Sequence, residues 1–375
     1  EISEMYEAFV TEKPDHASVV AAMFWIGKAR AREGKIEEAK QFTVDTLKRF
    51  IGEPRREAVE QLLTQLAQLC AKRPRPTAPV LTPVQVSQTK EPVIASTAAP
   101  VPAAEPPAPE PPPFDPAAEL EKRLAPLEEG ANATAKARLM YARAELASLR
   151  KKPADRDRLI ESIAGEFKPE DLSPLLLAQI GDLHLGKGDH ERAATYYTRL
   201  KEDFPKSDYL DVAYVGLGEI AFAKKKYDDA LPLFTDALEK IAASMKLKEA
   251  TIGKAKTLLE LGQYAESRKL FEQVASVREW RGDSTAYAVF SLGEIEARQG
   301  RSAEAIAHYR RVFVAYQKFL PWVAKAYLRA AESFEKMGKR KDAIENLQEM
   351  LRNERLAPFP EAEQARRLLA QWGAT

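Results

Sequence analysis

The sequence contains one cysteine, Cys70, among 375 residues, so no disulfide can form within the chain. Its 57 lysines and arginines are balanced by 56 aspartates and glutamates. Surfaces that bind nucleic acid or acidic membranes usually carry a basic excess, so neither class of partner is expected. The sequence also has no run of about 18 apolar residues, and we therefore expect no membrane-spanning helix.

Histidine is scarce as well, with four in the chain. The best candidate for a metal site is the group Asp182, His184, Asp189 and His190. If a helix ends at Gly188, the two histidines point in different directions, so we expect no metal site there. No serine or cysteine lies in a nucleophile motif, and no glycine-rich phosphate loop follows a strand. The sequence therefore predicts a protein without metal, cofactor or catalytic activity.

Proline is concentrated in residues 74–113, where alanine, valine and threonine fill the positions between prolines. Such a composition cannot bury a core, and we expect a disordered, extended linker. At about 3.1 Å per residue it could hold its flanking blocks up to roughly 120 Å apart. Residues 1–73 read as helical hairpins, and we expect them to be the C-terminal end of an array that begins upstream.

The second half of the chain carries a regular internal repeat. Small residues recur at Gly181, Gly218, Ala255, Gly293 and Ala331, with spacings of 37, 37, 38 and 38 residues. This period is typical of a repeat made of two helices.

Each unit repeats the same internal order after its first small residue. A turn position follows seven residues later, a second small residue twelve later, and a bulky residue sixteen later. The two small residues favour close approach of two antiparallel helices, and glycine at the turn favours a left-handed backbone. The sets are Gly181, Gly188, Ala193 and Tyr197; Gly218, Lys225, Ala230 and Phe234; Ala255, Gly262, Ser267 and Phe271; Gly293, Gly300, Ala305 and Tyr309; Ala331, Gly338, Ala343 and Leu347.

This pattern resembles the tetratricopeptide repeat family. The unit that keeps it best contains Tyr214, Leu217-Gly218, Tyr227, Ala230 and Phe234. The resemblance implies a non-catalytic scaffold that binds protein partners. A further loop, Phe204-Pro205-Lys206-Ser207, is similar to repeats of bacterial envelope proteins of the Tol-Pal accessory and outer-membrane assembly lipoprotein types. It implies a periplasmic or cell-envelope location, with the cytoplasm as the alternative.

We therefore expect an all-α fold: an α-solenoid of antiparallel helical hairpins in two blocks joined by the proline-rich linker. The expected divisions are the end of an upstream array, the linker, a divergent capping hairpin, and five repeats closed by a capping helix. Their residue ranges are 1–73, 74–113, 114–173 and 174–372.

The first helices of the repeats are expected to line a concave groove. In the resembled family, partners contact these helices next to the signature small residue and one turn before it. The corresponding positions here are Asp182, Val215, Glu219, Phe222, Lys256, Tyr287, Phe290, Glu294, Leu328 and Glu332. Four of the five charged side chains are acidic, which favours a basic or amphipathic protein segment over a peptide held by its carboxyl terminus. A structural spacer, a self-assembling module and a regulatory subunit are the alternatives.

Overall fold

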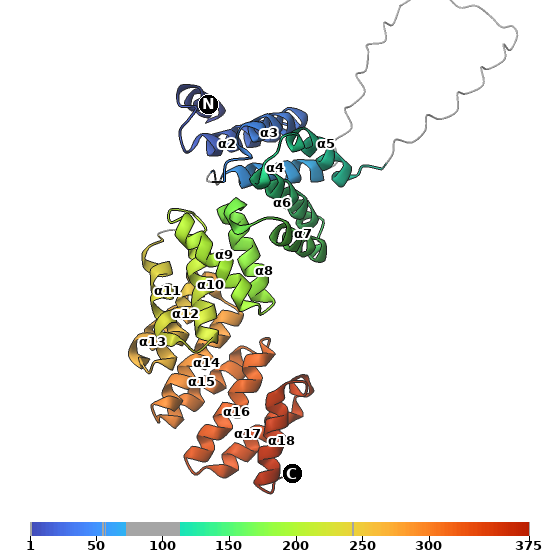
Figure 1. Cartoon of the computed structure of the whole chain (residues 1–375). Helices are drawn as coiled ribbons and strands as arrows, with labels where there is room; N and C mark the ends of the chain where they lie inside the picture. The colour runs from blue at the N-terminus through green and yellow to red at the C-terminus, as the bar shows by residue number, and fades with distance from the viewer. Residues whose placement is uncertain (1, 55, 57, 73–112, 242–243, 375) are drawn as a thin grey trace, which may run out of the picture. The chain divides into compact units, whose positions relative to one another are not determined.

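The computed structural model describes residues 2–54, 56, 58–72, 113–241 and 244–374. Within these ranges the chain forms eighteen α-helices, three short 3-10 helices and no strand (Figure 1). The all-α expectation is confirmed. The expected linker lies outside the described residues, except for Pro113. Two compact units, Glu1–Phe167 and Lys168–Thr375, are described separately below.

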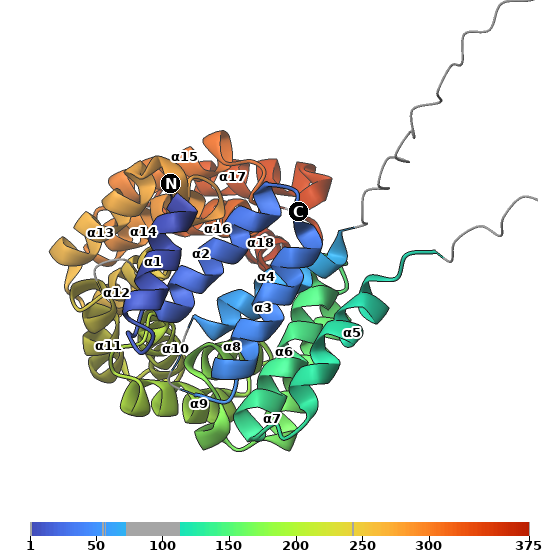
Figure 2. The same cartoon turned by 90° about the horizontal axis from the view of Figure 1, so that it is seen from above.

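The first unit contains seven α-helices. They are α1 (Ile2–Glu12), α2 (Val19–Arg32), α3 (Ile36–Phe50), α4 (Val59–Ala71), α5 (Pro116–Glu128), α6 (Ala133–Leu149) and α7 (Pro153–Glu166). Helices α1 to α4 pack in sequence. Across the proline-rich stretch, α6 packs on α4, and α5 packs on both α3 and α4 (Figure 2).

The two helical blocks that flank residues 73–112 are present as expected, and they contact each other. The helices on the two sides of residues 73–112 belong to one compact unit. The reason is that α4 and α6 each bury an apolar face, with Leu62 and Leu66 on α4 and Leu139 and Ala142 on α6. The finer assignment of these helices to an upstream array and a capping hairpin stays a prediction.

The second unit consists of five hairpins and a final helix. The first helices are α8 (Pro174–Gly186), α10 (Leu210–Ala223), α12 (Leu247–Glu260), α14 (Asp283–Arg298) and α16 (Leu320–Lys336). The second helices are α9 (His190–Asp203), α11 (Tyr227–Glu239), α13 (Tyr264–Ser276), α15 (Ser302–Ala315) and α17 (Arg340–Arg352). Helix α18 (Pro360–Gln371) follows, and η1 (Pro169–Asp171), η2 (Arg278–Trp280) and η3 (Glu354–Leu356) are the 3-10 helices.

Successive first helices contact each other along this unit, from α8 to α16 and on to α18. Each second helix packs on its own first helix and on the next hairpin. The first helices therefore form one continuous layer, as the repeat spacing predicts. Helix α18 packs on the last hairpin, where it buries Ala362, Ala365 and Leu369 while Arg366 and Arg367 remain exposed.

Glycine on the first helices makes room for the bulky residue of the second helix. The fully buried ring of Tyr197 lies between Gly181 and Gly216, and a Cβ on either glycine would come within 3.0 Å of the ring. Phe234 lies between Gly218 and Gly253 in the same way. Each ring thus inserts between its own hairpin and the next, and Gly216 is part of a helix rather than a nucleotide-binding loop.

The turns inside the hairpins have the left-handed backbone that the pattern predicts. Gly188, Gly262, Gly300 and Gly338 have φ values of 75°, 74°, 77° and 71°. Lys225 takes the same position in the second hairpin with a φ of 57°, although it is not glycine. Because a Cβ disfavours this conformation, Lys225 marks a local strain in the array.

Candidate interaction surface

The ten predicted groove residues all lie on the first helices α8, α10, α12, α14 and α16. We call them the first-helix strip. Val215, Phe290 and Leu328 are buried in the packing of the unit, whereas Phe222 and Tyr287 are half-buried. The strip therefore offers a few apolar side chains to a partner, together with the charged residues between them.

Asp182 is the first residue of the strip, and its carboxylate has two partners. The Tyr197 hydroxyl donates a hydrogen bond to Asp182 Oδ1 at 2.6 Å. Lys246 Nζ, just before α12, lies 3.3 Å from Asp182 Oδ2. Burial, with help from the nearby Asp182 carboxylate, raises the pKa of Tyr197 well above its ordinary value, so this hydroxyl remains a donor.

Glu219 and Lys256 form the next pair. Lys256 Nζ lies 2.5 Å from Glu219 Oε2 and 4.3 Å from the centre of the Phe222 ring. The ammonium group thus contacts a carboxylate and an aromatic face at once, an arrangement that favours a fixed position. These two residues lie on neighbouring first helices, so the pair connects consecutive hairpins.

Glu294 is also paired. It accepts a hydrogen bond of 2.5 Å from the Tyr309 hydroxyl, and Arg329 Nε lies 3.3 Å from its Oε1. Arg329 in turn lies 2.8 Å from Glu332 Oε2. Every carboxylate of the strip therefore has a cationic neighbour, and the excess of negative charge read from the sequence is largely neutralised within the fold.

Sequence reasoning missed Trp322, which covers part of the strip from α16. Its ring centre lies 4.7 Å from that of Tyr287 and 5.7 Å from that of Phe290. Its Nε1 donates a hydrogen bond of 2.9 Å to Asp283 Oδ1 on α14. A helical spacing of three and four residues places Trp322, Lys325, Arg329 and Glu332 on one face of α16, and this signal could have revealed it.

The histidine group does not form a metal site. His184 is buried in α8 and stacks on Tyr196 with ring centres 5.8 Å apart. Its Nδ1 lies 3.9 Å from Asp189 Oδ2, while His190 begins the next helix. Across the described part of the chain, no three histidine, cysteine or acidic side chains are grouped so that they could hold a metal ion.

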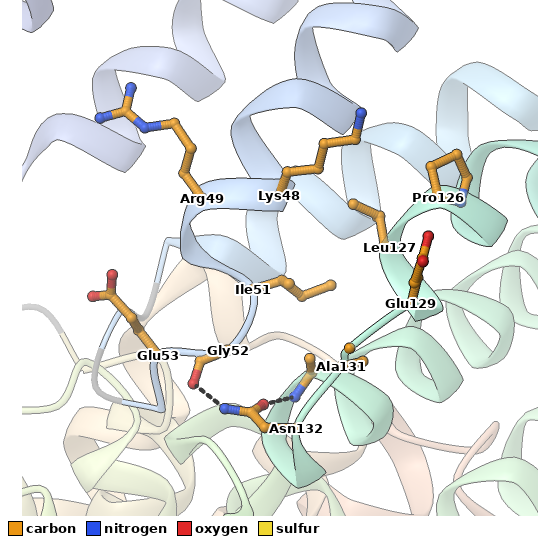
Figure 3. A pocket seen from close by; sticks show the side chains of 12 residues that line it. Lys48, Arg49, Ile51, Gly52, Glu53, Pro126, Leu127, Glu129, Ala131 and Asn132 are labelled. Carbon is orange, nitrogen blue, oxygen red and sulfur yellow. Dashed lines mark hydrogen bonds between the residues drawn. The ribbon is translucent and has the colours of Figure 1, made fainter.

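A cavity of about 350 Å³ lies in the first unit, between the end of α3 and the start of α6 (Figure 3). The Asn132 side chain donates to Gly52 O at 3.0 Å and caps α6 by accepting from Ala135 N at 2.9 Å. Of the four charged residues that line the cavity, Lys48 pairs with Asp45 and Glu53 pairs with Arg56. The lining of this cavity is therefore mainly polar.

The single thiol is also unsuited to chemistry. Cys70 is fully buried on α4, and burial raises its pKa to about 11. The thiol is therefore protonated near neutral pH, whereas a nucleophilic cysteine needs a thiolate.

Comparisons with known proteins address the second unit. Models of the tetratricopeptide repeat match residues 179–245 and 252–317, residues 221–278, and residues 325–354. No curated protein matches the sequence. None of the described helices is long and apolar enough to cross a membrane.

Several solved structures are similar in fold at low sequence identity. PilW, a type IV pilus biogenesis factor, is 12% identical over 61% of this chain and 97% of its own, with a TM-score of 0.46. YrrB, a protein with an unusual peptide-binding site, is 20% identical over 56% and 97%, with a TM-score of 0.39. MamA from Desulfovibrio magneticus RS-1 is 18% identical over 49% and 96%, with a TM-score of 0.39.

Family match, repeat spacing and hairpin stacking agree with one another. The second unit of this chain is therefore an array of tetratricopeptide repeats, a fold that typically serves as a protein–protein interaction scaffold and is usually non-catalytic.

Proposed function

We propose that the chain is a non-catalytic scaffold whose second unit binds a segment of a protein partner along the first-helix strip. The observation that carries this proposal is the continuous layer of first helices, which brings side chains from five hairpins into one row. A row of this length suits an extended or helical segment better than a small molecule.

The partner segment should be amphipathic. Phe222, Tyr287 and Trp322 are half-buried, and large aromatic side chains often dominate the energy of protein interfaces. The charged groups between them form ion pairs, such as that of Glu219 with Lys256, so a partner meets both signs of charge. A segment with apolar side chains on one face and both charges beside them complements this surface better than a purely basic one.

We further propose a location in the bacterial cell envelope. Support comes from the Phe204-Pro205-Lys206-Ser207 loop between α9 and α10, which is similar to loops of envelope proteins. Fractionation of cells that produce the protein from its own gene tests this: recovery in the periplasm or envelope supports it, and recovery in the cytoplasm overturns it.

Binding along the strip is tested by charge reversal in the full chain. A variant with Glu219→Lys and Glu294→Lys should lose its main captured partner. The control carries the same change of charge on exposed second-helix residues, Glu272→Lys and Glu345→Lys, and should keep it. Both variants must retain the helical circular dichroism of the parent. Equal partner lists for the two variants would remove the proposal.

A further inference from the structure

The first unit buries an interface between helices that come from opposite sides of the proline-rich stretch. Helices α1 to α4 lie before residues 73–112, and α5 to α7 lie after them. The contacts of α4 with α6 and of α3 with α5 hold the two sets together (Figures 1 and 2). The residues that make these contacts all lie outside the stretch.

Arg138 on α6 is the centre of this interface and is fully buried. Its Nε lies 2.7 Å from Glu60 Oε1 on α4. Its two terminal nitrogens donate to the carbonyl oxygens of Ile51, Glu53 and Arg56, at 2.9, 2.8 and 2.8 Å. One guanidinium group therefore contacts one oxygen of the Glu60 carboxylate, whose Oε2 is buried without a hydrogen bond, and three backbone carbonyls that all lie before the stretch.

A second set of charges joins α3 to α5. Lys40 is almost completely buried, and its Nζ lies 2.9 Å from Glu119 Oε1. Arg123 on α5 pairs with Glu37 on α3. Because buried charges are costly without their partners, these groups specify how the two sets of helices fit together.

We infer that residues 1–72 and 113–375 are complementary pieces that recognise each other without the chain between them. The surface formed by α3 and α4 has one specific partner, the α5–α6 segment of this same chain. Cleavage between residues 73 and 112 therefore leaves a single assembled protein. The stretch connects two parts of one unit, and its hydrolysis does not release an N-terminal fragment.

The test cuts the full chain at one place. Residues 95–99 are replaced by the recognition sequence of a site-specific protease, and the product is analysed by size exclusion with light scattering at micromolar concentration. We expect both pieces in one peak with the mass of the uncut chain, and Cys70 should stay unreactive towards a thiol reagent. Two separate peaks, or a reactive Cys70, would overturn the inference.

A matched pair of variants tests the role of the buried arginine. Arg138→Leu should weaken association of the cut pieces on the order of 100-fold or more, because it leaves Glu60 buried without its cation. Arg143→Leu is the control, since Arg143 lies on the same helix but pairs with Glu121 and Glu128 on its own side of the cut. Equal weakening by both substitutions would contradict the proposed recognition.

A milder pair of variants applies if the uncut Arg138→Leu chain does not fold. Glu119→Gln removes one charged partner of the buried Lys40, and Glu121→Gln changes an exposed carboxylate on the same helix. Dissociation of the cut pieces should increase only for Glu119→Gln. An unchanged affinity in both variants would show that these charges do not specify the interface.

Discussion

Lys256 Nζ lies 2.5 Å from Glu219 Oε2, and this ion pair joins two first helices across 37 residues of sequence. The side chains are 17% and 32% exposed, so water screens part of the attraction. Reversing either charge alone should destabilise the array, and reversing both should restore most of the loss. We expect a coupling energy of about 0.5–1 kcal/mol that decreases with salt, measured by urea unfolding of the four proteins. A coupling energy of zero would show that the ion pair does not contribute to the stability of the array.

Gly216→Ala should destabilise the second unit by about 1–3 kcal/mol, because its new Cβ would come within 3.0 Å of the buried Tyr197 ring. The control is Gly186→Ala at the end of α8, where nothing lies within 4 Å. That change should be neutral or stabilise by up to about 1 kcal/mol, since alanine favours a helix. Thermal unfolding of both variants measures the difference, and equal effects would argue against the insertion of the ring.

Lys225→Gly should stabilise the second hairpin. Lysine at φ 57° is strained by its Cβ, and glycine occupies this turn position in the other four hairpins. After the greater flexibility of glycine in the unfolded chain is subtracted, we expect a gain of about 0.5–1 kcal/mol in the free energy of unfolding. A loss of stability would mean that contacts of the Lys225 side chain stabilise the fold by more than the strained backbone destabilises it.

Because of Tyr287, we expect the free energy of unfolding to decrease at alkaline pH. Burial raises its pKa to about 12 in the folded protein, compared with about 10 in an unfolded chain. Above pH 10 the unfolded state releases this proton while the folded state keeps it. The contribution of Tyr287 is therefore complete below pH 10 and is lost as the pH rises to 12.

The measurement compares unfolding free energies of the parent and of Tyr287→Phe between pH 9 and 12. Phenylalanine cannot ionise, so the variant should lose less stability over this interval. Parallel curves for the two proteins would show that the Tyr287 hydroxyl titrates normally in the folded state.

The repeat spacing was enough to predict the stacked hairpins, because small residues at Gly181 and Gly218 and bulky ones at Tyr197 and Phe234 recur with the helix packing they support. The turn glycines were equally informative, since a left-handed backbone restricts the residue type. These are local requirements, and a periodic sequence repeats them visibly.

The charge pairing of the strip was harder to predict. The cationic partner of Glu219 is Lys256, 37 residues later in the sequence, and that of Asp182 is Lys246, 64 residues later. Counting acidic residues on one helix face therefore overestimated the negative charge that a partner meets. The neighbours one and two repeats later have to be considered together with each position.

No local feature of the sequence indicates that helices from the two sides of the proline-rich stretch pack together in the first unit. Arg138 resembles any helical arginine in the sequence, but its partner Glu60 lies 78 residues earlier. A composition that cannot form a core reads as a spacer between blocks, whether or not its flanking helices pack together. Only the three-dimensional arrangement distinguishes the two cases.

Site-specific photo-crosslinking in living cells tests most directly whether the first-helix strip holds a protein partner. A crosslinking amino acid replaces Phe222 on the strip in one full-length chain, and the exposed Gln273 on the second helix α13 in another. We expect a discrete crosslinked protein from position 222 and none from position 273. Crosslinks at position 273 alone, or at neither position, would contradict the proposed scaffold function.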